Sequence, residues 1–235
     1  MEEVKEYKLK IIKLIDETPD TKTFRVERKG QIGFKPGQFF MVRFEDNSNL
    51  HRAYSIASSP TDKNHMDITM NLVGTFTEKL WSAKAGDYLM FKGPYGKFYF
   101  DESIKEDLIL IGGGLGITPF RSILRYCANF KLENKIKLIY SVKAPKDIVY
   151  KDELEKLKEE NPNYALVLTM TRPTPDWKGR IGRINEMLLK ENISNMENSL
   201  FYLCGSLDFV RDMAKMLESL GAKKEKIRKD IWGNY

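Results

Sequence analysis

Hydrophobic and polar residues alternate in short runs over the first hundred positions, which is the pattern of half-buried β-strands. Clusters of Gly, Pro, Asn and Asp separate these runs and indicate turns. We expect strands over residues 7–14, 21–27, 38–44, 52–57, 66–73 and 87–92, a short helix over 74–81 and a turn over 93–96. Many short strands broken by turns are typical of a barrel. Residues 1–101 are therefore predicted to form an antiparallel Greek-key β-barrel domain.

The period of the pattern changes at Asp107. Continuous apolar runs, expected for buried strands, alternate from here with amphipathic stretches expected for helices. The predicted strands are 108–111, 135–141, 165–170 and 200–204, and the predicted helices are 118–130, 151–160, 184–190 and 207–220. This order predicts a parallel sheet with helices on both faces. Residues 105–235 are thus expected to form a Rossmann-like α/β domain, with the boundary at 101–105.

Composition narrows the classes of function. No apolar run is long enough to span a bilayer and the first residues lack the order of a secretory signal, so we expect no membrane span and a cytoplasmic location. The 2 cysteines are far apart and the 2 histidines lack helical spacing, which argues against a metal or iron–sulfur site. The net charge of +6 is spread over mixed charges and does not indicate nucleic-acid binding.

A glycine run follows the predicted strand 108–111. Residues 112–116 enter a helix, where backbone N–H groups and the helix dipole can bind a phosphate. The run differs from the common dinucleotide motif, because Pro119 replaces its third glycine and Ser141-Val142-Lys143 stands where an acidic residue is expected. The alternative is a tight turn that only requires glycine.

A second motif, Arg52-Ala53-Tyr54-Ser55, lies on a predicted barrel strand. Arg52 and Tyr54 would share one face, because side chains alternate along a strand. A guanidinium can bind a diphosphate through two hydrogen bonds, and the aromatic ring beside it can pack on a flat ligand. The alternative is a solvated face of the barrel.

Together the motifs resemble the ferredoxin–NADP⁺ reductase family of two-domain flavin reductases. The resemblance spans nearly the whole chain, and Gly93-Pro94-Tyr95-Gly96 resembles the family's turn before the second domain. It implies FAD on the barrel, with FMN as the alternative. The flavin-binding positions that it implies are Arg52, Ala53, Tyr54, Ser55, Asn71, Val73, Gly74, Thr75, Phe76 and Thr77, with Trp232 or Tyr235 as an aromatic ring stacked on the flavin.

The same resemblance implies NADPH or NADH on the second domain. The implied positions are Gly113, Gly114, Gly116, Ile117, Thr118, Pro119, Ser141, Lys143, Thr171, Arg172, Cys204 and Gly205. Ser55, Cys204 and Asp230 are implied catalytic residues: a hydroxyl near flavin N5, a thiol beside the point of hydride transfer, and the acidic residue before the terminal aromatic ring. Cys204 alone would be read as a small buried hydrophobe, and the C-terminus as a frayed end.

Thr171 and Arg172 stand where family members that use NADPH hold the 2′-phosphate, and Lys143 in place of a carboxylate points the same way. The alternative for both cations is a solvated loop. The resemblance implies hydride transfer between NAD(P)H, with NADPH favoured, and FAD, and then electron transfer to a small carrier such as ferredoxin or flavodoxin.

Two other functions remain open. One is a flavin subunit of a larger redox complex, like the electron-transfer subunit of dihydroorotate dehydrogenase, although that subunit carries a C-terminal cysteine cluster which this sequence lacks. The other is a non-catalytic module that binds flavin or a nucleotide. The oligomeric state is open.

Overall fold

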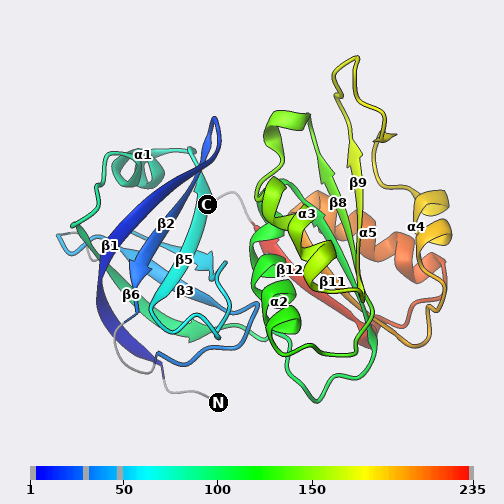
Figure 1. The fold of residues 1–235 in the computed structure, drawn as a ribbon, viewed down its shortest axis with the longest axis horizontal. Helices are drawn as coiled ribbons and strands as arrows, with labels where there is room; N and C mark the ends of the chain where they lie inside the picture. The colour runs from blue at the N-terminus through cyan, green and yellow to red at the C-terminus, as the bar shows by residue number, and fades with distance from the viewer. Residues whose placement is uncertain (1–3, 29–31, 47–49, 233–235) are drawn as a thin grey trace. The chain divides into compact units, whose positions relative to one another are not determined.

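The computed structural model describes residues 4–28, 32–46 and 50–232. The chain divides into two compact units, one of residues 1–101 with 118–126 and one of residues 102–117 with 127–235 (Figure 1). The sequence pattern groups residues 118–126 with the second domain, but in the structure they cluster with the first. Their side chains make the contacts that explain this, for example between the rings of Phe120 and Phe98, whose centroids are 6.2 Å apart.

The first unit is built on a six-stranded antiparallel sheet in the order β4-β3-β6-β1-β2-β5. Its elements are β1 (Lys5–Thr18), β2 (Thr21–Glu27), β3 (Phe39–Arg43), β4 (His51–Ser55), β5 (His65–Asn71), α1 (Thr75–Trp81) and β6 (Tyr88–Tyr95). A single antiparallel bridge between Ile56 and Ile68 joins the two ends of the sheet. The predicted N-terminal Greek-key barrel is confirmed.

The predicted turn over residues 93–96 is wrong. Gly93 and Tyr95 lie within β6, where they pair with Lys5 of β1 and Phe39 of β3. The rings of Tyr95 and Phe39 stack with their centroids 5.7 Å apart. Turn chemistry is a local signal, and cross-strand pairing on both sides of β6 outweighs it here.

The second unit contains a six-stranded parallel sheet in the order β10-β9-β8-β7-β11-β12. Its strands are β7 (Asp107–Gly113), β8 (Ile136–Val142), β9 (Tyr164–Met170), β10 (Arg180–Ile181), β11 (Ser199–Ser206) and β12 (Ile227–Trp232). The helices are α2 (Ile117–Asn129), α3 (Lys151–Glu160), α4 (Glu186–Asn192) and α5 (Leu207–Ser219), with short 3₁₀ helices at Gly114–Gly116, Pro145–Asp147 and Lys224–Lys226. The predicted α/β domain is confirmed.

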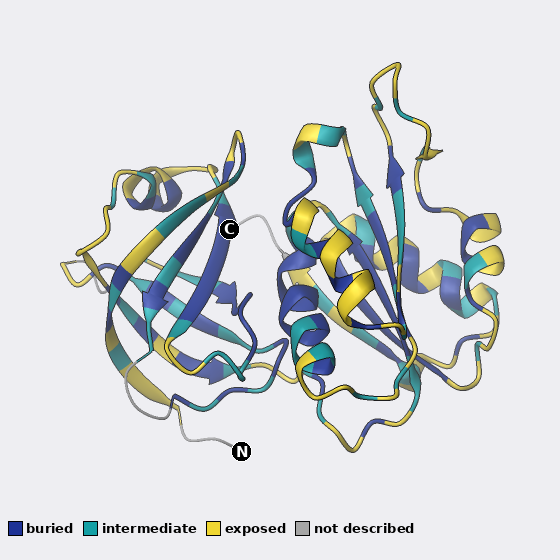
Figure 2. Ribbon diagram, in the orientation of Figure 1, coloured by how far each residue is buried: buried dark blue, intermediate teal, exposed yellow. Residues whose placement is uncertain are grey.

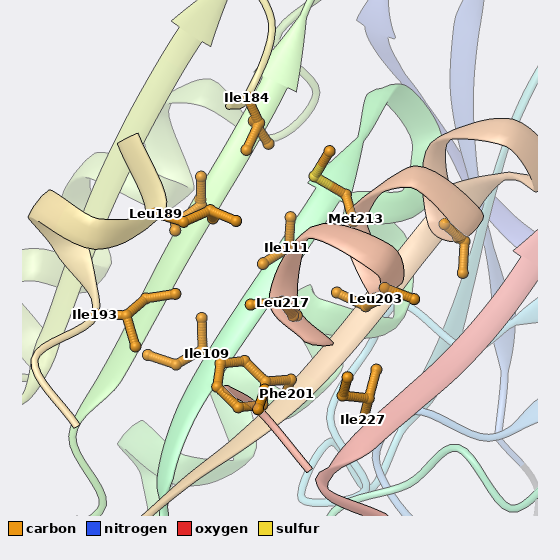
Figure 3. Packing of buried hydrophobic residues seen from close by; sticks show 14 of the residues in the cluster. Ile109, Ile111, Ile184, Leu189, Ile193, Phe201, Leu203, Met213, Leu217 and Ile227 are labelled. Atoms are coloured by element: carbon orange, nitrogen blue, oxygen red, sulfur yellow. The ribbon is translucent and has the colours of Figure 1, made fainter. Parts of the chain in front are cut away.

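Helices α4 and α5 cover one face of the parallel sheet. Ile109 and Ile111 of β7 point into this layer with Phe201 of β11, where Leu189 and Leu217 from the helices meet them (Figure 3). Helix α3 packs on the opposite face against β9, with its polar side exposed (Figures 1 and 2). Burial on both faces explains why the strand 108–111 is apolar without alternation.

The sequence pattern did not predict β10 and β12. Among the side chains of β12 that the structure describes, those of 227–231, only Ile227 is buried, so this run carries no strong apolar signal. The strand is specified by its parallel pairing with β11, which is a contact far away in the sequence. The helices in the described part of the chain are too short or too polar to span a membrane. Within the same residues, no group of three acidic, histidine or cysteine side chains could hold a metal ion.

Candidate functional site

The first motif lies on β4, at one end of the barrel sheet. Ser55 and Tyr54 are buried, whereas Arg52 is half-exposed. The Arg52 guanidinium donates to the His51 carbonyl oxygen at 2.8 Å and forms no ion pair within the described residues. Burial raises the pKa of Tyr54 above its ordinary value, although the positive charge of Arg52 acts in the opposite direction. The Tyr54 hydroxyl is therefore neutral, and the Arg52 guanidinium near it is the positive charge that can bind an anion.

The second predicted flavin segment begins α1 and contacts the first motif. The ring centroids of Phe76 and Tyr54 are 6.0 Å apart. Gly74 has φ +76°, in the left-handed region, and a Cβ atom built there would meet no described atom within 4 Å. No described side chain caps the first N–H groups of α1, because the N-cap residue is Gly74. The Thr77 hydroxyl donates to the Gly74 carbonyl at 2.9 Å and accepts the Val73 amide at 2.7 Å. A helix start without a side-chain cap, preceded by a glycine with open space around it, fits a phosphate.

The glycine loop follows β7 in the second unit. Gly114 is exposed at φ +52°, and a Cβ atom there would again meet nothing described within 4 Å. Gly116 is the opposite case, because its Cβ atom would lie 2.2 Å from the Cys204 carbonyl oxygen of β11. Only glycine lets this loop pass so close to β11, and only an exposed left-handed glycine leaves room for a ligand. The loop therefore fits a pyrophosphate.

Strand order places the other predicted nucleotide residues at the same edge of the sheet. The order reverses at β7, between β8 and β11, and ligands of open α/β sheets bind at such a point. The carboxyl ends of β7, β8, β9 and β11 carry the glycine loop, Ser141 with Lys143, Thr171 with Arg172, and Cys204 with Gly205. Ile117, Thr118 and Pro119 follow the loop and are buried.

Lys143 and Arg172 are held next to each other by backbone hydrogen bonds. The Thr171 amide donates to the Val142 carbonyl at 3.1 Å, and the Arg172 amide donates to the Lys143 carbonyl at 2.7 Å. Both side chains are exposed, and neither forms an ion pair within the described ranges. The nearest described carboxylate is that of Asp147, which accepts the Ala144 amide at 3.0 Å. Two adjacent cations suit an additional phosphate.

The pairing of β11 with β12 brings two predicted catalytic residues together. Asp230 lies opposite Cys204, and the Cys204 Sγ donates to the Asp230 Oδ2 at 3.8 Å. Cys204 is fully buried and Asp230 is half-exposed. Ser55 belongs to the first unit. The side chain of Trp232 and all of Tyr235 lie outside the described residues, so the stacked aromatic ring stays a prediction.

The sequence interpretation missed a charged cluster in the first unit. Asp67 of β5 is completely buried and binds both Arg25 of β2 and Arg121 of α2. The available signal was a carboxylate inside the predicted strand 66–73, where an unpaired charge would be costly. The sequence does not indicate its partners, because they lie 42 and 54 positions away.

Two family models match the chain in the order of the two units. Residues 8–100 match the oxidoreductase FAD-binding domain, and residues 110–215 match the oxidoreductase NAD-binding domain. These ranges contain the Arg52 motif and the two glycines with open space around them, Gly74 and Gly114. They end before Asp230.

The chain is also similar to curated proteins and solved structures. It is 30% identical over 211 residues to a protein of Serratia proteamaculans (strain 568) that is one of the subunits of the Na⁺-translocating NADH-quinone reductase, and the match covers 83% of this chain and 52% of that protein. The chain thus spans about half the length of the curated relatives it matches.

Among solved structures, the ferredoxin reductase in carbazole 1,9a-dioxygenase has a TM-score of 0.86 at 24% identity and covers 97% of this chain and 69% of that one. A ferredoxin NADP⁺ reductase from Neisseria gonorrhoeae, with bound FAD and NADP, has a TM-score of 0.82 at 24% identity. That match covers 98% of this chain and 99% of the reductase chain. At this identity, the likeness concerns the fold.

Proposed function

The chain belongs to the ferredoxin reductase-like family of FAD- and NAD-binding oxidoreductases, and from this premise we propose that it oxidises NADPH and passes the electrons through FAD to a protein carrier. The observation that supports two cofactors is that Gly74 and Gly114, one in each unit, each stand at the start of a helical segment with open space around them. Gly86, Gly182 and Gly221 have the same open space but do not begin a helix. Gly74 and Gly114 each combine a left-handed backbone with free space, in the unit whose family model names the matching cofactor.

The side chains of the first unit would hold the flavin. Bound FAD supplies an acceptor that takes two electrons as a hydride and releases them together or singly. Arg52 would neutralise the diphosphate, and the N–H groups at the start of α1 would donate hydrogen bonds to it. Tyr54, kept neutral by burial, provides an uncharged ring surface. Ser55 is the hydroxyl that we assign to the reacting edge of the flavin.

The side chains of the second unit would hold the nicotinamide dinucleotide. The N–H groups of the glycine loop bind the pyrophosphate, and Gly114 keeps the approach open. Cys204 and Asp230 are assigned to the nicotinamide end, where the buried thiol contacts the carboxylate and limits the positions that either group can take. Hydride transfer needs orientation more than a strong base, so these residues act by placement.

The preference for NADPH rests on Lys143 and Arg172. A 2′-phosphate would supply the ionic partner that both cations lack among the described residues, whereas the ribose hydroxyl of NADH would not. The NADH-quinone reductase name of the curated relatives favours NADH instead. An anaerobic titration of the flavin spectrum with each nucleotide decides between them. Stronger bleaching at equal concentrations of NADH would refute the preference.

Arg172→Ala tests the residue itself. Loss of a hydrogen bond to a charged group should weaken NADPH binding by about 10- to 100-fold. NADH binding to the same variant is the matched control and should change by less than about threefold, a shift near 0.6 kcal/mol. Calorimetry with both nucleotides measures the two constants. Equal losses for NADPH and NADH would contradict the assignment.

The acceptor is proposed to be a small carrier such as ferredoxin or flavodoxin. A second candidate, a larger redox complex, is favoured by the curated relatives, which are named as a subunit and are about twice as long. When the reduced protein is mixed with ferredoxin or flavodoxin under argon, the absorbance of the carrier should show that it becomes reduced on the time scale of the experiment. If neither carrier is reduced and the protein elutes from host extract in a heavy complex, the second candidate holds. If neither nucleotide bleaches the bound flavin, the enzyme proposal fails and a binding module remains.

A further inference from the structure

A cavity of about 250 Å³ lies at the amino edge of the parallel sheet, wholly within the second unit. It is lined by the first residues of β7, β8 and β9 and by the segment that leads from the end of α4 to the start of β11. The nucleotide loop follows the other end of β7, and the rise over Asp107–Gly113 separates the two edges by ~20 Å. The cavity is therefore distinct from the candidate nucleotide site.

Part of the lining is apolar. Ile109 of β7 and Ile136 of β8 are buried, and Ala165 of β9 is exposed. Ile109 belongs to the apolar layer on the α4 side of the sheet (Figure 3). Ile109, Lys137 and Ala165 are paired across three neighbouring strands, so their side chains lie on the same face. An apolar group that covers this part of the lining would be removed from water, which favours binding.

The same face carries charges of both signs. Asp107 and Lys135 each stand two positions before a member of the pair formed by β7 and β8, so their side chains lie on that face as well. Neither the Asp107 carboxylate nor the Lys135 ammonium group forms a hydrogen bond or ion pair with a residue that the structure describes. The Lys137 Nζ donates to the Asn192 carbonyl oxygen at 2.6 Å, and this bond leaves two N–H groups for another acceptor.

These charges favour a ligand that is itself a zwitterion. Strand spacing and rise place the Cα atoms of Asp107 and Lys137 ~8 Å apart, a span that their side chains and a small molecule between them can bridge. A simple anion would bring its charge close to Asp107, and a simple cation would face both lysines, so each would meet a repulsive interaction. A molecule with a carboxylate and an ammonium group can pair with all three side chains.

We propose that this cavity binds a small aliphatic amino acid. The carboxylate accepts hydrogen bonds from Lys135 and Lys137, the ammonium group pairs with Asp107, and the apolar side chain covers Ile109 and Ala165. The volume of about 250 Å³ is below the ~300–1,000 Å³ of sites for drug-sized ligands, which suits a molecule of this size. The inference does not depend on the proposed electron transfer, because no described residue assigned to either cofactor lines the cavity.

L-Leucine is the probe, and the amide chemical shifts of the nitrogen-labelled full chain are the readout. We expect shifts at residues 107–109, 135–137, 163–165 and 192–199, with a dissociation constant of about 0.1–1 mM, as suits so small a ligand. Isocaproate is leucine without its ammonium group, and isoamylamine is leucine without its carboxylate. Each of these matched ligands should bind at least about tenfold more weakly than leucine, because one charged partner is lost.

Asp107→Asn tests the pairing with the ammonium group, and Glu133→Gln is its matched control. Glu133 is an exposed carboxylate two positions before Lys135 that does not line the cavity. Both variants remove one negative charge from the same edge of the unit. Asp107→Asn should weaken leucine binding about tenfold without weakening isocaproate binding, whereas Glu133→Gln should change neither by more than about twofold. If Asp107→Asn does not fold, Lys135→Met takes its place and should weaken both ligands about threefold or more.

The outcomes are distinct. Shifts at the expected residues, with the stated order of the three ligands and the loss in Asp107→Asn alone, support the proposal. No shift at about 10 mM leucine, or shifts confined to residues 113–119, would overturn it. Isocaproate that binds as tightly as leucine, or an equal loss in Glu133→Gln, overturns the assignment of a zwitterion. The titration needs neither flavin nor nucleotide, so it remains decisive if the flavin of the wild-type protein is not bleached and the proposed function fails.

Discussion

Substitution of two glycines in the same loop by alanine should give opposite phenotypes. At Gly116 the added Cβ atom would lie 2.2 Å from the Cys204 carbonyl oxygen and 2.6 Å from its carbonyl carbon, whereas ordinary contact begins at 3.4 Å. The loop or β11 must then move by 1.2 Å (3.4 minus 2.2). At Gly114 the added atom meets nothing described, and the only structural cost is the left-handed backbone at φ +52°.

The two costs can be estimated. Overpacking a close contact costs about 1–3 kcal/mol, and the upper end applies to Gly116 because a backbone carbonyl cannot rotate away. For a chain of this size that corresponds to a fall of about 6–12 °C in the unfolding midpoint. A left-handed alanine costs ~1–2 kcal/mol, partly offset by ~0.4–1 kcal/mol from the stiffer unfolded chain. Gly114→Ala should therefore lower the midpoint by only about 2–4 °C.

Calorimetric unfolding without ligands measures the first effect, and isothermal titration with NADPH measures the second. Gly116→Ala should unfold markedly earlier. Gly114→Ala should nearly keep its midpoint but lose about tenfold or more in NADPH affinity, because the methyl group occupies the space offered to the pyrophosphate. A Gly116→Ala midpoint within about 2 °C of wild type, or a larger fall for Gly114→Ala, would refute the argument from backbone approach.

Three further expectations follow from single side chains. Arg52→Ala should lose flavin during gel filtration while His51→Ala retains it, and full occupancy measured by absorbance in Arg52→Ala would contradict the diphosphate assignment. Asp67 has a folded pKa below its ordinary value of 3.8, so its stabilisation is complete above that value and is lost as the pH falls through the folded pKa; Asp67→Asn should therefore destabilise the protein at neutral pH and flatten the acid limb of a plot of unfolding midpoint against pH. Burial raises the pKa of Cys127 to about 12, so its thiol should resist iodoacetamide at about pH 8, near the ordinary thiol range, until the protein is denatured, as mass spectrometry of its peptide would show.

Local patterns in the sequence determined the architecture and the kind of site. Strand alternation before residue 101 and apolar runs after Asp107 follow from which side of each element is buried, and burial has the same period as the backbone. The glycine loop could likewise be predicted from a local pattern in the sequence. A left-handed or crowded backbone position selects glycine at that position, as at Gly114 and Gly116.

Contacts between distant segments were decided only by the tertiary structure. Nothing near Asp230 in the sequence indicates that it pairs with Cys204, because β12 is specified by its backbone pairing with β11, a distant segment of the chain. The adjacency of Lys143 and Arg172 likewise arises from hydrogen bonds that continue the pairing of β8 and β9 beyond their ends. Side-chain periodicity describes which face a residue occupies, but strand order and register depend on free energies summed over partners far away in the chain.

The charged cluster around Asp67 shows the same division most clearly. The sequence contains a carboxylate in an apolar strand and therefore requires some cation nearby, because an unpaired buried charge is costly. Which cation it is depends on the fold, and the fold supplies Arg121 from the helix that follows the nucleotide loop. The residue types and their approximate burial are local properties of the chain, whereas the ion pair that joins Asp67 of β5 to that helix exists only in the folded protein.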